Sequence, residues 1–221
     1  GILMRCLFII LSVFFYSLNL TAQDSKKITN KYFFDFEIDI PTPAFKKKKG
    51  FTKYDEMMIF LDEMKSKHGD IFSYEFIGES QKGKKIPMVF IGDQSIGKTK
   101  VCFMGGLHGN EPASSEGIFL LLHNLLIEDS LKDLSKNLNI ALIPMANIDG
   151  YEIQSRYASN GQDLNRDHTK LTNPEMNFIK KAISDFNPDV MIDFHEYKPY
   201  RVDFVNFGEY GTTSMFDCMF L

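Results

Sequence analysis

Cysteine is scarce in this chain of 221 residues, which contains only Cys6, Cys102 and Cys218. Proteins held together by disulfide bonds need a denser set of cysteines, so the sequence implies no disulfide framework. Cys102 stands in an apolar, strand-like run, where a buried free thiol is the commoner case. With 44% hydrophobic and 24% charged residues, the chain can instead form one domain around an apolar core.

A strong excess of charge of either sign is also missing, because the formal net charge is −4. Proteins that attract nucleic acid through their overall field are clearly basic, so we expect no nucleic-acid partner. The only basic run, Lys46 to Lys49, is interpreted as part of a solvated linker.

The apolar run near the start of the chain, residues 7–20, is short for a membrane span. It follows Met4 and Arg5 and leads to Ala22, after which the chain becomes polar. A basic start, an apolar segment and a small residue are typical of a secretory signal. We therefore expect residues 1–22 to be a signal peptide cut after Ala22, a secreted or periplasmic protein, and no stable membrane anchor after cleavage.

Beyond the signal, residues 23–50 are polar, contain two prolines and end in the lysine run. They are expected to form a linker or pro-segment, and residues 51–221 are expected to form the folded domain. In that domain, helical patterns alternate with strand-like apolar runs. The helical patterns cover residues 52–68, 112–127 and 174–186, and the strand-like runs cover 71–77, 86–91, 101–104, 138–145 and 190–194.

This alternation predicts an α/β fold, with a mixed, mostly parallel twisted sheet and helices on both faces. The run at 190–194 is expected to be a buried strand. A possible competitor to an enzyme site lies at residues 92–99, which match the phosphate-binding pattern G-x-x-x-x-G-K-[ST]. That motif needs a helix directly after the loop, whereas residues 101–104 are of β type. We therefore expect residues 93–100 to connect two adjacent strands as a hairpin, and no bound nucleotide.

The next loop carries a more informative pair, because His108 and Glu111 have the H-x-x-E spacing of many zinc sites. They follow an apolar strand and precede Pro112, which can start a helix. Open α/β sheets bind ligands at such strand-to-helix turns. Catalytic zinc commonly has three protein ligands and a water, and the third candidate is His195, at the end of the apolar run 190–194. We predict that the three side chains meet around one Zn²⁺ ion.

Several further motifs lie between the second and third candidate ligands. With them, the sequence resembles the zinc carboxypeptidase family, the carboxypeptidase A-like metallopeptidases, over roughly residues 52–200. The matching pieces are Gly105 to Glu111, Asn147 to Gly150, Ser155-Arg156, Asp163 to Arg166, and His195. A minor departure is Ile148, where the family has proline.

The resemblance implies zinc ligation by His108, Glu111 and His195. It also implies that Arg156 polarises the scissile carbonyl and stabilises the oxyanion. Asn165 and Arg166 would bind the free terminal carboxylate of a peptide substrate, Arg166 as a bidentate clamp. Asp163 would accept a hydrogen bond from the far nitrogen of His108. Taken alone, the two arginines would be interpreted as members of ordinary surface ion pairs.

The implied reaction is hydrolysis by zinc-activated water, which needs a carboxylate base. In the family this base is a glutamate on a later strand, well beyond the third ligand. After His195 the chain has only Glu196 and Glu209, and we assign neither as the base. The expected fold is therefore carboxypeptidase/phosphorylase-like but C-terminally incomplete, with residues 51–221 a partial catalytic domain.

Three other functions are weighed against a secreted zinc metallocarboxypeptidase. A zinc deacylase of the succinylglutamate desuccinylase and aspartoacylase type shares H-x-x-E and a distant histidine, but the secretion signal argues against it. A catalytically inactive zinc-binding or peptide-binding fragment is favoured by the missing base. A P-loop ATPase, with Asp193 as its magnesium-binding aspartate, ranks last.

Overall fold

The computed structural model describes residues 40–196. The predicted signal peptide, most of the predicted linker, Cys218 and Glu209 lie outside the described residues. Within residues 40–196, none of the helices combines the length and the apolar character needed to cross a bilayer.

A sheet of five strands forms the centre of the described domain, in the order β1-β2-β4-β3-β5. The strands are β1 (Phe72–Glu79), β2 (Lys85–Ile91), β3 (Thr99–Met104), β4 (Leu138–Ile143) and β5 (Val190–Asp193). Strand β2 is antiparallel to both of its neighbours, whereas β3 is parallel to both of its own. All strands except β2 therefore point the same way. The predicted α/β fold with a mixed, mostly parallel sheet is confirmed.

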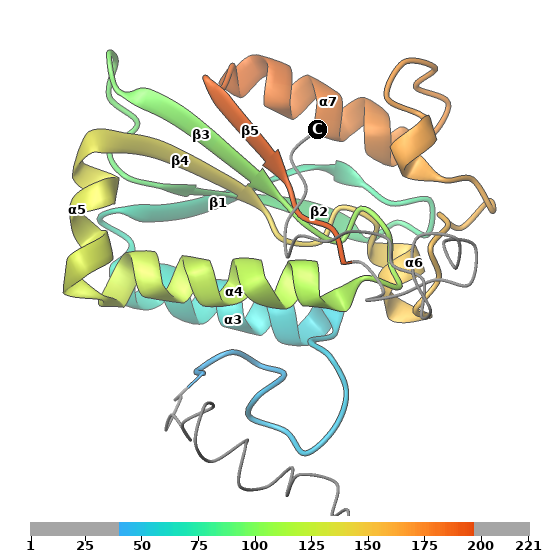
Figure 1. Cartoon of the computed structure of the whole chain (residues 1–221), viewed down its shortest axis with the longest axis horizontal. Helices are drawn as coiled ribbons and strands as arrows, with labels where there is room; N and C mark the ends of the chain where they lie inside the picture. Colours follow the sequence, from blue (N-terminus) through green and yellow to red (C-terminus); the bar gives the residue numbers. More distant parts are fainter. Residues whose placement is uncertain (1–39, 197–221) are drawn as a thin grey trace, which may run out of the picture. The chain divides into compact units, whose positions relative to one another are not determined.

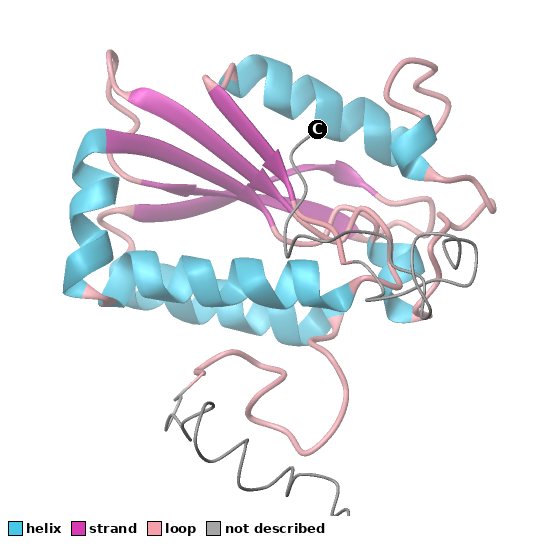
Figure 2. Cartoon of the chain, viewed as in Figure 1, coloured by secondary structure: helices cyan, strands magenta, loops and turns pink. Residues whose placement is uncertain are grey.

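Helices cover both faces of this sheet, with α3 and α4 side by side on one face and α7 on the other (Figures 1 and 2). The elements are α3 (Tyr54–His68), α4 (Pro112–Ile127), α5 (Asp129–Asn137), α6 (Ile148–Glu152), the short 3-10 helix η1 (Leu164–Arg166) and α7 (Pro174–Phe186). Helices α4 and α7 have the bounds that the sequence predicts, because each begins with a proline at its first position. Helix α5 was not anticipated.

The main core lies between the sheet and the pair α3 and α4. Phe60 of α3 meets Phe119 of α4 edge to face, with 5.9 Å between the ring centroids. Cys102 on β3 is fully buried and free, as predicted. Burial raises the pKa of its thiol to about 12, so Cys102 serves as a small apolar core residue.

The predicted hairpin between residues 86–91 and 101–104 is wrong, because β4 lies between β2 and β3. After β3, helices α4 and α5 carry the chain back so that β4 adds parallel to β3, as in other strand-helix-strand crossovers. The loop of residues 92–98 passes across the end of β4. Two strand spacings amount to about 10 Å, which seven residues span easily.

The expectation of a buried strand at 190–194 is also wrong for the described residues. Val190 is 45% exposed, and Met191 and Phe194 are each 38% exposed. Among the strands described here, β5 pairs only with β3 and forms an edge. An apolar run shows that a strand is compatible with burial, but its burial depends on which segments lie beside it.

Candidate metal centre

The loop between β3 and α4 places two of the predicted ligands at the carboxyl end of the parallel strands. Glu111 is the residue immediately before the helix, and residues 105–109 of its loop are buried. A Cβ atom on Gly109 would lie 2.1 Å from the backbone carbon of Gly150 in α6. Glycine therefore allows this loop to press against α6, which holds His108 on the inner side of the turn.

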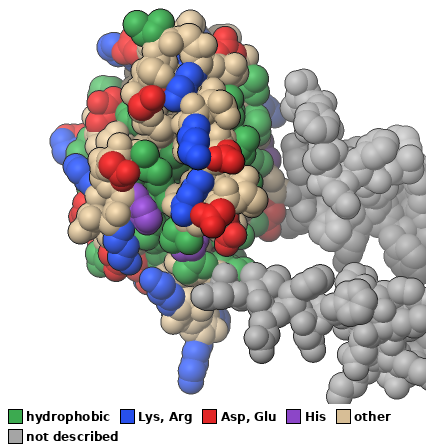
Figure 3. All heavy atoms as spheres, turned by 90° about the vertical axis from the view of Figure 1, so that its left-hand side faces the viewer, with side chains coloured by type: hydrophobic (Ala, Val, Ile, Leu, Met, Phe, Trp, Pro, Cys, Tyr) green, Lys and Arg blue, Asp and Glu red, His purple; other side chains and the backbone are tan. Residues whose placement is uncertain are grey.

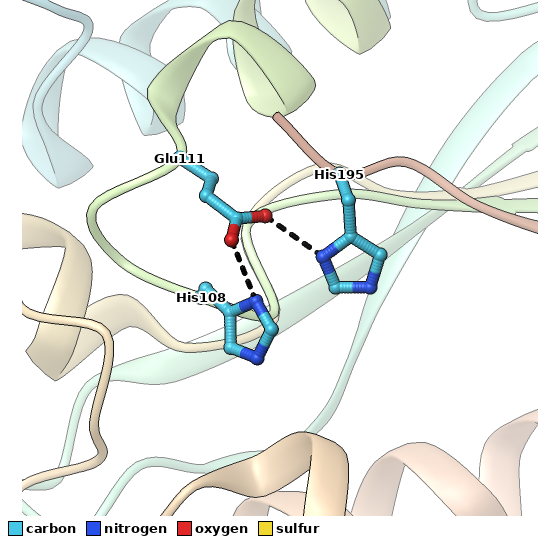
Figure 4. Close-up of side chains that lie close together, drawn as sticks. All are labelled: His108, Glu111 and His195. Atoms are coloured by element: carbon cyan, nitrogen blue, oxygen red, sulfur yellow. Dashed lines mark hydrogen bonds and ion pairs between the residues drawn. The ribbon is translucent and has the colours of Figure 1, made fainter. Parts of the chain in front are cut away.

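The structure brings the three predicted ligands together (Figure 4). His108 Nδ1 lies 2.8 Å from Glu111 Oε1, and His195 Nδ1 lies 2.8 Å from Glu111 Oε2. One ligand atom from each residue falls within a group no wider than 4.8 Å. The two imidazole rings approach to 4.7 Å between centroids. Side chains 84 residues apart in the sequence thus present their donor atoms to one small volume.

The donor set suits zinc. Two imidazole nitrogens and one carboxylate are a common ligand set of catalytic zinc sites, which leave a fourth position for water. Both rings turn the same atom, Nδ1, toward Glu111, and the side chains are largely withdrawn from solvent, with 3% of His108, 12% of Glu111 and 15% of His195 exposed. The residues therefore fit a bound Zn²⁺ ion.

Electrostatics keep the central carboxylate ionised. Burial acts to raise the pKa of Glu111, but hydrogen bonds from His108, His195 and the Glu196 amide outweigh it and hold that pKa well below its ordinary value. In the metal-free protein, the hydrogen bond to Asp193 and then that to Glu111 raise the pKa of His195 to about 9. A metal ligand must be a neutral imidazole, so metal binding would displace a proton from His195.

Arg156 and Asp163 stand directly beside the ligands. Asp163 Oδ1 lies 3.1 Å from His108 Nε2, which is the predicted contact with the far nitrogen of that ring. Arg156 donates from Nε to Asp163 Oδ2 at 3.0 Å, and its Nη1 lies 3.5 Å from Glu111 Oε1. About a third of the Arg156 side chain, 35%, remains exposed. The guanidinium is thus fixed by the site and still open to a substrate.

The short helix η1 carries Asn165 and Arg166 next to this pair. Asp163 Oδ1 accepts a hydrogen bond from the Asn165 amide at 2.9 Å, so Asp163 links η1 to His108. Arg166 is exposed, and its Nη1 donates to the Asn165 carbonyl at 3.2 Å. The Asn165 side-chain oxygen lies 3.2 Å from His168 Nε2. The contacts of the described residues connect both predicted carboxylate binders to the ligand cluster through Asp163.

Asp193 and Glu196 also contact the cluster, although the sequence did not predict either contact. Asp193 Oδ2 lies 3.1 Å from His195 Nε2. The sequence alone does not predict this contact, because His195 lies two residues beyond the end of β5. Glu196 donates its backbone amide to Glu111 Oε2, while its carboxylate accepts from the Ala113 amide in the first turn of α4. The Glu196 carboxylate therefore turns toward helix α4.

The competing motif at residues 92–99 lies away from this cluster. It runs into strand β3 at Thr99 and not into a helix, so the backbone arrangement of a phosphate-binding loop is not formed. Lys98, the lysine of the motif, is paired with Asp93 at 2.7 Å. Figure 3 shows acidic and basic side chains interspersed on the side of the molecule that faces left in Figure 1.

A His-Glu-His cluster that could hold a metal ion lies at the carboxyl end of the parallel strands of an α/β protein. Comparison with known proteins identifies the family. The family model described as zinc carboxypeptidase matches residues 57–199. The chain belongs to this family, whose members act on peptides.

Individual relatives agree with this assignment. The chain is 29% identical over 160 residues to carboxypeptidase 2 of Trichophyton rubrum, covering 69% of this chain and 30% of that protein. It is 32% identical over 140 residues to carboxypeptidase 2 of Trichophyton tonsurans, covering 63% of this chain and 25% of the relative. The chain thus spans less than a third of the curated relatives it matches.

Solved structures show the same fold. Carboxypeptidase A from Helicoverpa armigera aligns with a TM-score of 0.62 at 20% identity, over 71% of this chain and 50% of that one. A metallo-carboxypeptidase from Burkholderia cenocepacia aligns with a TM-score of 0.59 at 21% identity, over 66% of this chain and 42% of that one. The sheet and helices described above therefore have the same fold as these structures.

Proposed function

We propose that this chain binds one Zn²⁺ ion through His108, Glu111 and His195 and is the metal-binding part of a metallocarboxypeptidase that hydrolyses the C-terminal bond of peptides, with a carboxylate base that none of the described residues supplies. The observation that carries the proposal is the convergence of two Nδ1 atoms and one carboxylate beside an accessible arginine. Membership of the zinc carboxypeptidase family supports the same chemistry.

The reaction follows from the residues around the cluster. Bound zinc would polarise the scissile carbonyl and lower the pKa of a bound water. Arg156 donates to the carbonyl oxygen as it gains negative charge, and its bond to Asp163 fixes the guanidinium before the substrate arrives. Asn165 and Arg166 bind the terminal carboxylate, which selects the last peptide bond. Asp163 holds the His108 ring with Nδ1 on the side of Glu111, where that nitrogen would be available as a metal ligand.

The same proposal includes a location outside the cytoplasm. It rests on the signal-like residues 1–22, with a basic start, an apolar segment and Ala22 before a polar stretch. N-terminal sequencing of the protein recovered from the culture medium or periplasm tests it. A mature chain that begins at Gln23 supports the location, and an intact N-terminus in the cytoplasm refutes it.

The assay compares peptides with free and amidated C-termini, with acylated amino acids as a third substrate class. We expect zinc-dependent hydrolysis of the free peptides. Arg166→Ala should lower kcat/KM on them by about 10- to 100-fold, the value of a charge-assisted bidentate contact. The variant should have much less effect on amidated peptides.

Two variants serve as controls for this assay. Arg166→Lys keeps the charge but loses the fork, so its effect should be intermediate. Lys170→Ala removes an exposed cation nearby and should leave the kinetics unchanged. Equal losses by Arg166→Ala on free and amidated peptides would contradict the carboxylate role. Preferential hydrolysis of acylated amino acids would instead indicate a deacylase.

A further inference from the structure

His195 is the ligand that comes from a distant part of the chain, and its ring is held from two sides. Its Nδ1 lies 2.8 Å from Glu111, and its Nε2 lies 3.1 Å from Asp193 Oδ2. Asp193 is the last residue of β5, which hydrogen-bonds to β3 in register with Met104. The backbone of the residue that carries this carboxylate is therefore held in the sheet, at the last position of the strand.

The other imidazole has a matching arrangement. His108 lies between Glu111 on its Nδ1 side and Asp163 on its Nε2 side. Each histidine thus has a carboxylate behind the ring, but the two carboxylates differ in their own partners. Asp163 is bonded to Arg156 and to a backbone amide. The Asp193 carboxylate, by contrast, has a hydrogen bond with His195 as its partner among the described residues.

The second carboxylate oxygen of Asp193 also distinguishes this residue from Asp163. Oδ1 is buried and has no hydrogen-bond partner among the described residues. An acidic oxygen withdrawn from water without a partner is unfavourable for folding. Such a group is explained more readily by a role beside a metal ligand than by stability.

We propose that Asp193 is a positioning residue for the metal centre, which orients the His195 ring and holds its proton on Nε2. An imidazole protonated at Nε2 keeps the lone pair of Nδ1 available, and Nδ1 is the atom that faces the other ligands. This inference rests on the proposed zinc site. It concerns affinity for the metal, and it requires no contact between Asp193 and the substrate.

The test measures the zinc dissociation constant of the full chain by competition with a chromophoric chelator. Asp193→Ala should weaken zinc binding by about 10- to 100-fold, the usual effect of losing such a supporting carboxylate. Asp193→Asn keeps a hydrogen-bond acceptor and should retain part of the affinity. The absorption spectrum of the Co²⁺-substituted protein should also change in Asp193→Ala, because the geometry around the metal relaxes.

Asp189→Ala provides the matched control. Asp189 precedes β5, and its carboxylate accepts a bond from the Lys100 amide at 2.8 Å. The Asp189→Ala substitution should alter the urea midpoint of the metal-free protein without changing its zinc affinity or the Co²⁺ spectrum. Equal zinc affinity in the parent and Asp193→Ala would overturn the role of Asp193 alone. A parent protein that takes up no zinc would overturn the proposed metal site itself.

Discussion

Two glycine-containing loops flank strand β3, and both resemble functional motifs in the sequence. The loop before the strand, residues 92–98, matches a phosphate-binding pattern, and the loop after it, residues 105–111, carries H-x-x-E. The first is mostly exposed and contains Ile96 in full contact with solvent, whereas residues 105–109 of the second are buried. A match to a sequence motif therefore does not by itself show which of the two loops forms a ligand site.

The two loops differ in the end of the sheet at which they lie. The second loop leaves the carboxyl ends of parallel strands and enters α4, where a neighbouring strand end can bring in His195. The first loop enters β3 at the opposite end, where Lys98 pairs with Asp93 at the surface. The comparison teaches that a ligand site in such a sheet depends on the strand end at which a motif stands.

Removing a ligand should have the largest effect. His108→Ala should abolish stoichiometric zinc binding and peptide hydrolysis, because two side chains do not complete the site. Zinc content is measured by elemental analysis of the purified protein. His123→Ala, a histidine within α4 that lies outside the cluster, should keep the parent's zinc content. Parent-like zinc in His108→Ala would refute the ligand assignment.

Glycine substitutions test the packing difference between the loops. Gly109→Ala should lower the free energy of unfolding by about 3 kcal/mol, because its Cβ would overlap the backbone of Gly150. Gly97→Ala meets no atom within 4 Å, but its φ of +91° remains strained and should cost only about 1 kcal/mol. Urea unfolding of the metal-free proteins checks both values, and similar losses would contradict the comparison.

Acid should affect the stabilisation by a buried carboxylate more than that by an exposed one. Asp167 is buried near η1; burial opposes the shift, but bonds from Thr172 and Asn173 lower its pKa to about 2 from 3.8. Its stabilisation is present above pH 3.8 and is lost as the pH falls through 2, an effect of about 2 kcal/mol. In the Asp167→Asn variant, the free energy of unfolding of the metal-free protein should therefore change less with pH between these two values than it does in the parent.

The control for this pH effect is Asp93, whose pKa is also lowered to about 2, by Lys98, but at a fully exposed position. Solvent screens that pair, so Asp93→Asn should leave the acid dependence of the urea midpoint close to the parent's. A flattening as large as that of Asp167→Asn would show that exposed and buried carboxylates contribute alike.

The smallest effect is expected for Lys98→Ala. An exposed ion pair contributes little, so the free energy of unfolding should change by less than about 1 kcal/mol, with zinc content and peptidase activity unaffected. Adding ATP should not shift the melting temperature of the parent. An ATP-dependent shift that disappears in Lys98→Ala would restore the nucleotide hypothesis for this loop.

Much of the local structure follows from the sequence. The bounds of α4 and α7 and the existence of all five strands were predicted, because periodic apolar residues and prolines act over short distances. The convergence of His108, Glu111 and His195 was predicted from their shared position at strand ends. Strand order was not predicted, because no local signal shows that β4 inserts between β2 and β3.

The sequence by itself determined the donor types of the site, the elements that carry them and the family, because these depend on residue identity and short-range pattern. Only the tertiary structure decided that β5 is exposed on the described sheet, that Asp163 and Asp193 stand behind the two imidazoles, and that Glu196 faces α4. These features depend on contacts between segments remote along the chain or on the turn of one side chain, and both arise only when the sheet assembles.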